Sequence, residues 1–303
     1  MAKIAIIGAG TIGLSFAALH LAKNPDCSVV IYDTRTDLQE YVSQHLPGYL
    51  IDADEVSCIR RLSFSHSLES AVEGATIVQE QGPENLEFKK VMWPQVEEHA
   101  PADALFWSST SGIPASEQNQ NMKVRSRLVV CHPYNPPHIM PLLEVVRSPQ
   151  TSGDVVERTL QYWRGLGRTP VVVKKECIGF VANRLAFALF REACSLVSQG
   201  VVEVEDLDEI VRASMGPRWT VAGPFKAYHA GGGEGGLRSF LDKIGGTVDN
   251  CWNASDEDAR KGNIKIGEAW QEGICQRAQD VYGIADTAER DRKTKRVLEA
   301  VNK

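Results

Sequence analysis

The chain has 303 residues, of which 43% are hydrophobic, so it can fill the core of one large or two ordinary globular domains. A net charge of -6 without long runs of one sign provides no basic face for a polyanion, so we expect no nucleic-acid partner. No segment approaches the roughly 18 consecutive apolar residues of a membrane span, so we expect no membrane partner either.

The N-terminal segment is predicted to form a strand, a glycine turn and a helix. Residues 3–7 (KIAII) are a short apolar run typical of a buried parallel strand, and residues 11–23 have helical spacing. In the turn GAGTIG, Gly8 allows the reversal, Gly10 lets a pyrophosphate approach the backbone, and Gly13 lets the helix pack closely. A signal peptide fits less well, because the glycines interrupt its apolar core. The predicted dinucleotide-binding residues here are Gly8, Gly10, Thr11, Ile12 and Gly13.

The next predicted strand, residues 28–32 (SVVIY), ends at Asp33. A carboxylate at this position accepts hydrogen bonds from the ribose hydroxyls of NAD and repels the 2′-phosphate of NADP. The sequence therefore predicts NAD as the cofactor. Arg35 keeps NADP open as an alternative, because an arginine near this pocket can bind the phosphate.

Strand-like and helix-like segments continue to alternate, which predicts a doubly wound α/β sheet. The expected strands are residues 75–80, 104–108, 127–131 and 170–174, and the expected helices are residues 85–98 and 154–166.

The pattern changes to long helices without strands after this point. We therefore expect an N-terminal Rossmann-type NAD-binding domain, residues 1–176, followed by an all-helical C-terminal domain, residues 177–303. Residues 231–236 (GGGEGG) predict a mobile loop, with a lid over the substrate as the alternative.

Two of the expected strands end in polar residues that suit alcohol oxidation. One runs into SSTSG, which offers the Ser111 hydroxyl, and another runs into His132. Hydride transfer from an alcohol carbon needs a base for the hydroxyl proton and donors for the developing alkoxide, and imidazole titrates closest to neutral pH. Glu144 could orient His132 if the proline-rich residues 134–141 fold the chain back. On these residues alone, an ordinary hydrogen-bonded histidine remains the alternative.

Motifs spread over nearly the whole chain resemble the 3-hydroxyacyl-CoA dehydrogenase family. They are, in order, GAGTIG (8–13), EQGPENLEFK (80–89), SSTSG (108–112), HPYNPPHIMPLLEVV (132–146), IGFVANRL (178–185) and GPRWTVAGPFKAYHAGGGEGG (216–236). Within the family, the chain looks most like members that act on free hydroxy acids, namely L-gulonate 3-dehydrogenase, which is related to lambda-crystallin, and L-carnitine dehydrogenase.

The resemblance implies roles for individual residues. It implies that His132 is the general base, that Glu144 orients it, and that Ser111 and Asn183 contact the reacting oxygen. It also implies a homodimer that forms through the helical domain. The further cofactor contacts that it implies are Glu84, Lys89, Ser109 and Asn135. We expect no metal, because His138 lacks a third ligand at a suitable spacing.

The segment after Asp33 bears on the substrate. Acyl-CoA members of the family carry an extended, lysine-rich helical hairpin there, whereas this segment is shorter and more acidic. We therefore expect a small free 3-hydroxy acid similar to L-gulonate or carnitine. Arg218 could pair with its carboxylate, and Trp219 could face a quaternary ammonium, although a surface ion pair and simple core packing are the ordinary alternatives.

Three other functions stay open at this point: a 3-hydroxyacyl-CoA dehydrogenase, a biosynthetic ketoreductase, and an NAD-binding structural protein of the crystallin type. The seven cysteines are odd in number, scattered and without a CxxC spacing, which favours reduced thiols and a cytoplasmic location.

Overall fold

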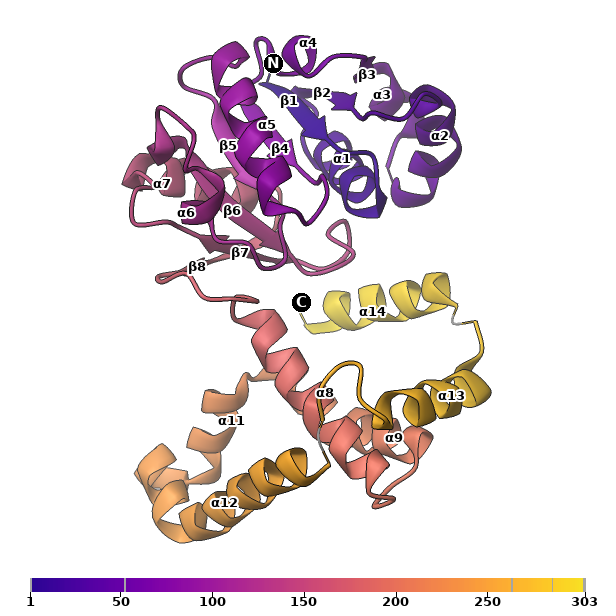
Figure 1. Cartoon of the computed structure of the whole chain (residues 1–303), viewed down its shortest axis with the longest axis vertical. Helices are drawn as coiled ribbons and strands as arrows, with labels where there is room; N and C mark the ends of the chain where they lie inside the picture. The colour runs from indigo at the N-terminus through magenta and orange to yellow at the C-terminus, as the bar shows by residue number, and fades with distance from the viewer. Residues whose placement is uncertain (1, 52, 263, 285, 302–303) are drawn as a thin grey trace. The chain divides into compact units, whose positions relative to one another are not determined.

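The computed structural model describes residues 2–51, 53–262, 264–284 and 286–301. The chain divides into two compact units, residues 1–184 and residues 185–303. The first holds a β-sheet with helices on both faces, and the described part of the second is helical (Figure 1). The expected order of an α/β domain and a helical domain is confirmed.

The first compact unit extends to Arg184. The reason is that the chain after β8 turns back onto the sheet. Phe180 is completely buried in the core of the first unit, and the amides of Val181 and Ala182 donate hydrogen bonds to Glu144.

The sheet has the strand order β3-β2-β1-β4-β5-β6-β7-β8. Strands β1 to β6 pair in parallel, β7 is antiparallel to β6, and β8 is parallel to β7. The strands β2 and β3 follow on one side of β1, and the strands from β4 onward follow on its other side. Open α/β sheets bind their ligands at this switch between β1 and β4. The strands are β1 (Ala2–Ile7), β2 (Cys27–Tyr32), β3 (Leu62–Ser65), β4 (Ile77–Glu80), β5 (Leu105–Ser108), β6 (Leu128–Pro133), β7 (Leu142–Val146) and β8 (Thr169–Val173).

Helices cover the two faces of the sheet, and each face has its own hydrophobic core. Side chains of α1, α2 and α7 pack into one core, and those of α4, α5 and α6 pack into the other. Helix α1 has the bounds that its apolar spacing predicts. The helices of the first unit are α1 (Thr11–Lys23), α2 (Leu38–His45), η1 (Leu46–Tyr49), α3 (Glu55–Arg60), α4 (Leu68–Val72), α5 (Leu86–His99), α6 (Ala115–Gln118), η2 (Arg125–Arg127) and α7 (Gly153–Gly165).

The second unit continues from helix α8, which begins at the end of the first. Within the described residues, no helix combines the length and apolar composition that crossing a bilayer requires. The helices are α8 (Ala182–Ser198), α9 (Val204–Ala213), α10 (Met215–Val221), α11 (Pro224–Gly231), η3 (Gly233–Gly235), α12 (Gly236–Lys261), α13 (Trp270–Tyr282) and α14 (Thr287–Val301).

The glycine-rich stretch 231–236 is a tight connection between two helices. It forms the end of α11, the short turn η3 and the start of α12. A Cβ atom on Gly232 would lie 1.7 Å from the Gly236 carbonyl oxygen, and one on Gly236 would lie 2.4 Å from the His229 ring. Close packing between the helices therefore explains why glycines occur here.

One core of the first unit contains a histidine. His20 of α1 is completely buried, with Nε2 2.8 Å from Gln79 Oε1 and Nδ1 2.7 Å from the Tyr162 hydroxyl. Burial, partly opposed by the hydrogen bond to Gln79, lowers the pKa of His20 to about 4. The side chain is therefore neutral at physiological pH.

This buried histidine should make stability depend on pH. Because the pKa of His20 is lower in the folded than in the unfolded protein, the unfolded chain binds the proton first as the pH falls. The free energy of unfolding should therefore decline by about 3 kcal/mol between pH 6.5 and pH 4 on account of this residue. Urea titrations over this range should show a shallower decline for His20→Gln. Equal slopes for the variant and the wild type would contradict the expectation.

Candidate active site

The turn between β1 and α1 requires glycine at two positions. Gly8 has φ +102°, and a Cβ atom there would lie 2.8 Å from the Gln81 carbonyl oxygen. A Cβ atom on Gly13 would lie 2.0 Å from the Gly8 carbonyl oxygen, so helix and strand approach each other through these two residues. By contrast, Gly10 faces open space, and it begins α1 without a side-chain cap. The first amides of α1 are thus available to an anionic ligand.

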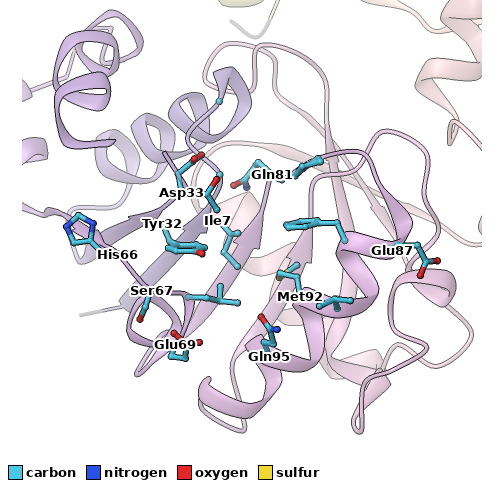
Figure 2. Close-up of a pocket in the computed structure, with 18 residues that line it drawn as sticks. Ile7, Tyr32, Asp33, His66, Ser67, Glu69, Gln81, Glu87, Met92 and Gln95 are labelled. Atoms are coloured by element: carbon cyan, nitrogen blue, oxygen red, sulfur yellow. The ribbon is translucent and has the colours of Figure 1, made fainter. Parts of the chain in front are cut away.

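A pocket of about 840 Å³ opens beside this turn. Figure 2 shows that its walls come from the ends of β1 and β2, the segment before α4, and helix α5. The lining includes Gly8, Gly10, Tyr32, Asp33, Ser67, Gln81, Phe88 and Met92. An elongated ligand can therefore run from the glycine turn toward the carboxyl end of β2.

Asp33 lies at this pocket and is held in place by the backbone. Its Oδ2 accepts from the Ala9 amide at 2.7 Å, and its Oδ1 accepts from the Arg35 amide at 3.0 Å. The Arg35 side chain is engaged elsewhere, because Nε donates to Asp37 at 2.7 Å and the guanidinium lies 3.4 Å from the centre of the Tyr41 ring. The hydrogen bond to Asp37 raises the pKa of Arg35. This arrangement leaves the pocket with a carboxylate at the ribose position, which suits NAD.

Replacing this carboxylate should weaken NAD binding. Asp33→Asn removes the charge with little change of shape, and hydrogen bonds to charged groups contribute about 1.5–3 kcal/mol. We expect the Kd for NAD to rise roughly tenfold or more, and the preference for NAD over NADP to narrow. Calorimetric titration with both dinucleotides measures this, with the exposed Asp26→Asn as the control. Unchanged discrimination would show that Asp33 does not contact the ribose.

The loop after β5 is organised by Glu84. One carboxylate oxygen of Glu84 accepts from the Thr110 hydroxyl at 2.5 Å and from the amides of Ser111 and Gly112 at 3.1 and 3.0 Å. The Ser111 carbonyl in turn accepts from Asn183 Nδ2 at 3.3 Å. Glu84 therefore shapes the SSTSG loop, and the structure places the Asn183 side chain beside the backbone of Ser111.

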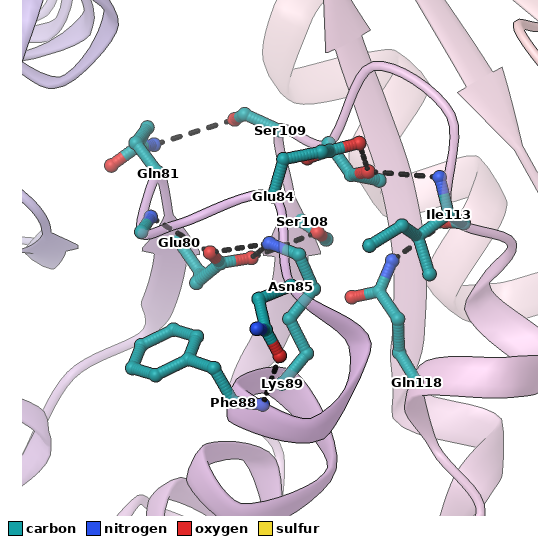
Figure 3. A network of polar contacts seen from close by, with 12 residues as sticks. Glu80, Gln81, Glu84, Asn85, Phe88, Lys89, Ser108, Ser109, Ile113 and Gln118 are labelled. Carbon is teal, nitrogen blue, oxygen red and sulfur yellow. Dashed lines mark hydrogen bonds and ion pairs between the residues drawn. The ribbon is translucent and has the colours of Figure 1, made fainter.

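Lys89 lies beneath this loop in a buried ion pair. Its ammonium donates to both oxygens of Glu80 at 2.6 and 2.7 Å, and the two side chains are 1% and 0% exposed. Glu80 also accepts from the Ser108 hydroxyl and the Gly82 amide (Figure 3). Lys89 is thus directed toward Glu80, and it is not among the residues that line the pocket beside the glycine turn.

His132 and Glu144 form the second buried pair. They are cross-strand partners in the antiparallel register of β6 and β7, and His132 Nδ1 lies 2.7 Å from Glu144 Oε2. The other oxygen of Glu144 accepts from the amides of Val181 and Ala182 at 2.8 and 3.0 Å. Burial raises the pKa of Glu144, but the hydrogen bonds from His132, Ala182 and Val181 outweigh it and leave the pKa lowered. Glu144 is therefore a carboxylate that accepts the Nδ1 proton, so Nε2 of His132 is the nitrogen left to take a proton.

A turn before α8 supports this pair. Gly179 and Phe180 both have positive φ, of +73° and +50°, which directs the next two amides at Glu144. A left-handed conformation is strained for a bulky residue, and the buried Phe180 ring, 5.2 Å from the His132 ring, holds it. Phe180 therefore positions the amides that bind Glu144. The sequence analysis did not identify this role, although a glycine and a phenylalanine directly before an expected helix could have indicated it.

The remaining predicted residues are placed as follows. Thr11 and Ile12 begin α1, Ser109 follows β5, and Asn135 is exposed on the segment between β6 and β7. His138 is bonded to Ser15, with Nδ1 2.8 Å from the hydroxyl. Arg218 and Trp219 are exposed on α10 of the second unit. Among the described residues, no group of three or more potential ligands could hold a metal ion.

Several pocket residues were not predicted from the sequence. Tyr32, Ser67, Gln81 and Phe88 line the pocket. Tyr32 and Gln81 could have been found, because each lies at the end of a strand that neighbours β1. Ser67 follows β3, which was not expected, and nothing in its local sequence indicated a ligand.

Dinucleotide-binding α/β proteins hold their ligand with a glycine turn before the first helix and a carboxylate after the second strand. This chain has both features and belongs to this class of protein. Residues 3–177 match the NAD-binding domain of 3-hydroxyacyl-CoA dehydrogenase, and residues 179–262 match the C-terminal domain. The chain belongs to the 3-hydroxyacyl-CoA dehydrogenase family.

Individual relatives agree with this assignment. An L-carnitine dehydrogenase of Streptomyces griseus is 34% identical over 307 residues, covering 99% of this chain and 90% of that protein. A 3-hydroxyacyl-CoA dehydrogenase of Gibberella moniliformis is 36% identical over 255 residues, covering 81% and 78%. The crystal structure of 5-formyl-3-hydroxy-2-methylpyridine 4-carboxylic acid 5-dehydrogenase, an NAD⁺-dependent dismutase, has a TM-score of 0.78 at 30% identity and covers 100% of this chain and 99% of that one. The predicted family, the likeness to L-carnitine dehydrogenase and the NAD cofactor are confirmed.

Proposed function

We propose that this NAD-dependent dehydrogenase interconverts the 3-hydroxyl and 3-keto forms of a small free hydroxy acid, of the carnitine or L-gulonate type. The observation that carries the proposal is the buried pair of His132 and Glu144 at the carboxyl end of β6. That edge of the sheet also carries the glycine turn and the loop with Ser109 and Ser111.

The proposed mechanism uses residues that the fold positions. His132 takes the proton of the C3 hydroxyl on Nε2, and Glu144 stabilises the resulting imidazolium. Ser111 and Asn183, which are hydrogen-bonded to each other, hold the reacting oxygen. NAD, when bound, supplies the hydride acceptor.

The role of Glu144 can be tested by Glu144→Gln. In the wild type, one oxygen of Glu144 accepts from two backbone amides and the other accepts from His132. In the variant, the two amides should retain the single carbonyl oxygen and the amide nitrogen would face His132 Nδ1, which forces the proton onto Nε2. We expect kcat to fall about 10²-fold, with little change in the Kd for NAD. A variant with wild-type kcat would show that Glu144 does not set the tautomer.

The choice of a free acid is supported by the segment between β2 and β3. The elements that its described residues form are the short helices α2 and α3 and the turn η1. The segment has more acidic than basic residues, which does not suit the phosphates of a CoA nucleotide. The relatives named L-carnitine dehydrogenase support a carnitine-like substrate. Arg218 and Trp219, exposed on α10, are the proposed contacts for a carboxylate and a quaternary ammonium.

A screen of NAD reduction with L-carnitine, L-gulonate, 3-hydroxybutyrate and 3-hydroxybutyryl-CoA tests the substrate proposal. We expect turnover of a free acid. Turnover of the CoA thioester alone would contradict it and favour an acyl-CoA dehydrogenase, the activity in the name of the Gibberella relative. Reduction of the corresponding 3-keto acids by NADH at a much higher rate than oxidation of the hydroxy acids would favour a biosynthetic ketoreductase, and tight NAD binding without any turnover would favour a structural role.

We also propose that the protein is a homodimer formed through its helical unit. Helix α8 exposes large apolar side chains, among them Phe187 at 63% and Phe190 at 56%. Helices α9 to α11 bury none of their residues, and a surface of this kind needs a partner. Sedimentation should give a dimer that dissociates in Phe187→Glu, with Lys243→Glu as the charge-changing control. A monomeric wild type would contradict the proposal.

A cytoplasmic location is proposed as well. All seven cysteines are unpaired thiols, and four of them, Cys27, Cys58, Cys131 and Cys194, are buried. This distribution suits a reducing compartment.

A further inference from the structure

The loop between β6 and β7 is anchored to helix α1 by Ser15. The amide of His138 donates to Ser15 Oγ at 3.0 Å, and His138 Nδ1 lies 2.8 Å from the same oxygen. Ser15 is completely buried near the start of α1. One side chain of the helix therefore makes two hydrogen bonds to a single residue of the loop.

The strand order shows which parts of the first unit this contact joins. Strands β4 and β5 lie between β1, which leads into α1, and β6, which carries His132. On its other side, the loop is held at the start of β8, because Arg168 Nη1 donates to the Pro137 carbonyl at 3.3 Å and the Thr169 amide donates to the Pro141 carbonyl at 2.8 Å. The loop therefore connects the helix after β1 with the far end of the sheet.

Tyr49 of η1 also packs against the anchored residue. Its ring meets the His138 ring edge-on, with the two centroids 5.2 Å apart. Burial raises the pKa of Tyr49, and a hydrogen bond from the Thr11 side chain partly opposes this effect. Thr11 and Ser15 are four residues apart on α1, so they share one face of the helix. The contacts around His138 thus extend to the first residue of the helix, close to the glycine turn.

This arrangement links the two sides of the proposed hydride transfer. The cofactor site is at the N-terminus of α1, whereas the proposed base lies on β6. His138 is six residues beyond His132 and three beyond Asn135, a predicted cofactor contact. A shift of the loop would change the spacing between the substrate and the nicotinamide, and a misplacement of about 1 Å can lower a rate about 10²-fold.

We propose that Ser15 and His138 are positioning residues for hydride transfer, which hold the loop after the catalytic strand in a fixed place relative to the cofactor helix. The inference rests on the proposed function and adds two residues to it. Both act through the loop, and neither is among the residues that line the pocket for the dinucleotide. It also gives a role to His138, which the sequence analysis considered only as a metal ligand.

The first test is a single-turnover measurement of NADH formation by stopped flow, with L-carnitine or, if the substrate screen favours it, L-gulonate. Ser15→Ala should lower the rate constant roughly 10- to 100-fold at full amplitude, with an unchanged Kd for NAD by calorimetry. A merely structural role would reduce the amplitude, which follows the folded fraction, and leave the rate constant unchanged. Ser148→Ala is the control, because it removes a buried hydroxyl that follows β7 at the opposite edge of the sheet.

The second test is a double-mutant cycle at His138. His138→Phe keeps a ring opposite Tyr49 but removes Nδ1, so the rate constant should fall, whereas His138→Asn keeps a polar atom near the position of Nδ1 and should retain most of the wild-type rate. In the Ser15→Ala background, His138→Phe should have no further effect, because the two side chains act through the same contact. Additive losses would overturn the proposal.

Hydrogen exchange of the free protein examines the anchor without any ligand. Peptides from residues 134–141 should exchange faster in Ser15→Ala than in the wild type or Ser148→Ala, and equal exchange would overturn the proposal. A Kd for NAD that rises in parallel with the loss of rate would do so too. If Ser15→Ala does not fold, His138→Phe, which alters a partly exposed side chain, decides the question by the same measurements.

The outcome also separates this inference from the proposed function. A wild type that turns over none of the hydroxy acids in the screen would overturn the proposed function and the positioning role with it. An active wild type whose rate constant is matched by Ser15→Ala would overturn the positioning role alone.

Discussion

His132→Ala is expected to reduce kcat by about 10²- to 10⁴-fold, the usual contribution of a general base. The expectation rests on the position of the imidazole, whose Nδ1 is held by Glu144 at 2.7 Å so that Nε2 is free to take the hydroxyl proton. The Kd for NAD should change little, because the pocket is lined by β1, β2, α5 and the loops beside them, and not by β6. Stopped-flow measurement of NADH formation with the preferred substrate gives the rate.

The control for this prediction is His99→Ala, which removes an exposed imidazole at the end of α5. Its kcat should equal that of the wild type. Wild-type turnover in His132→Ala with normal NAD binding would refute the proposed mechanism.

The sequence predicted the parts of the fold that local pattern determines. The apolar run of β1, the glycine turn and the helical spacing of α1 lie within a few residues of one another, and their packing depends on that short stretch. Asp33 could be predicted for the same reason, because it follows directly from the end of β2.

Features that depend on distant contacts could not be predicted in this way. The pairing of His132 with Glu144 results from the antiparallel register of β6 and β7, and LLEVV did not indicate a strand because a charged residue interrupts its apolar run. β3 escaped notice because LSFS is short and half polar. The hydrogen bonds from His20 to Gln79 and from Gln79 to Ser109 join a helix, a strand and the loop after β5, and no local motif marks them.

The resemblance implies that Lys89 contacts the cofactor, and this contact stays a prediction. In the structure, the ammonium of Lys89 is buried and bonded to both oxygens of Glu80. The Lys89–Glu80 ion pair therefore joins helix α5 to strand β4, which lies next to β1 and its glycine turn. The carbonyl of Glu80 also accepts from the amide of Ser109, so the same strand residue supports the SSTSG loop.

Lys89→Met should lower the free energy of unfolding by about 3–5 kcal/mol, since it leaves the charge of Glu80 buried without its ion-pair partner. The double variant Glu80→Gln/Lys89→Met should recover much of this loss, because neutral side chains carry no desolvation penalty for charge. Urea denaturation measures both values.

Lys90→Met is the matched control, because Lys90 is the next residue of α5 and pairs with the exposed Glu87 at 3.3 Å. Its effect should stay within about 1 kcal/mol, as for other surface pairs. If instead Lys89→Met kept wild-type stability and raised the Kd for NAD, the lysine would bind the cofactor as the resemblance implies. A large loss of stability with an unchanged Kd would show that this fold uses the lysine to fix Glu80, and through Glu80 the position of the Gly82 amide at the edge of the pocket.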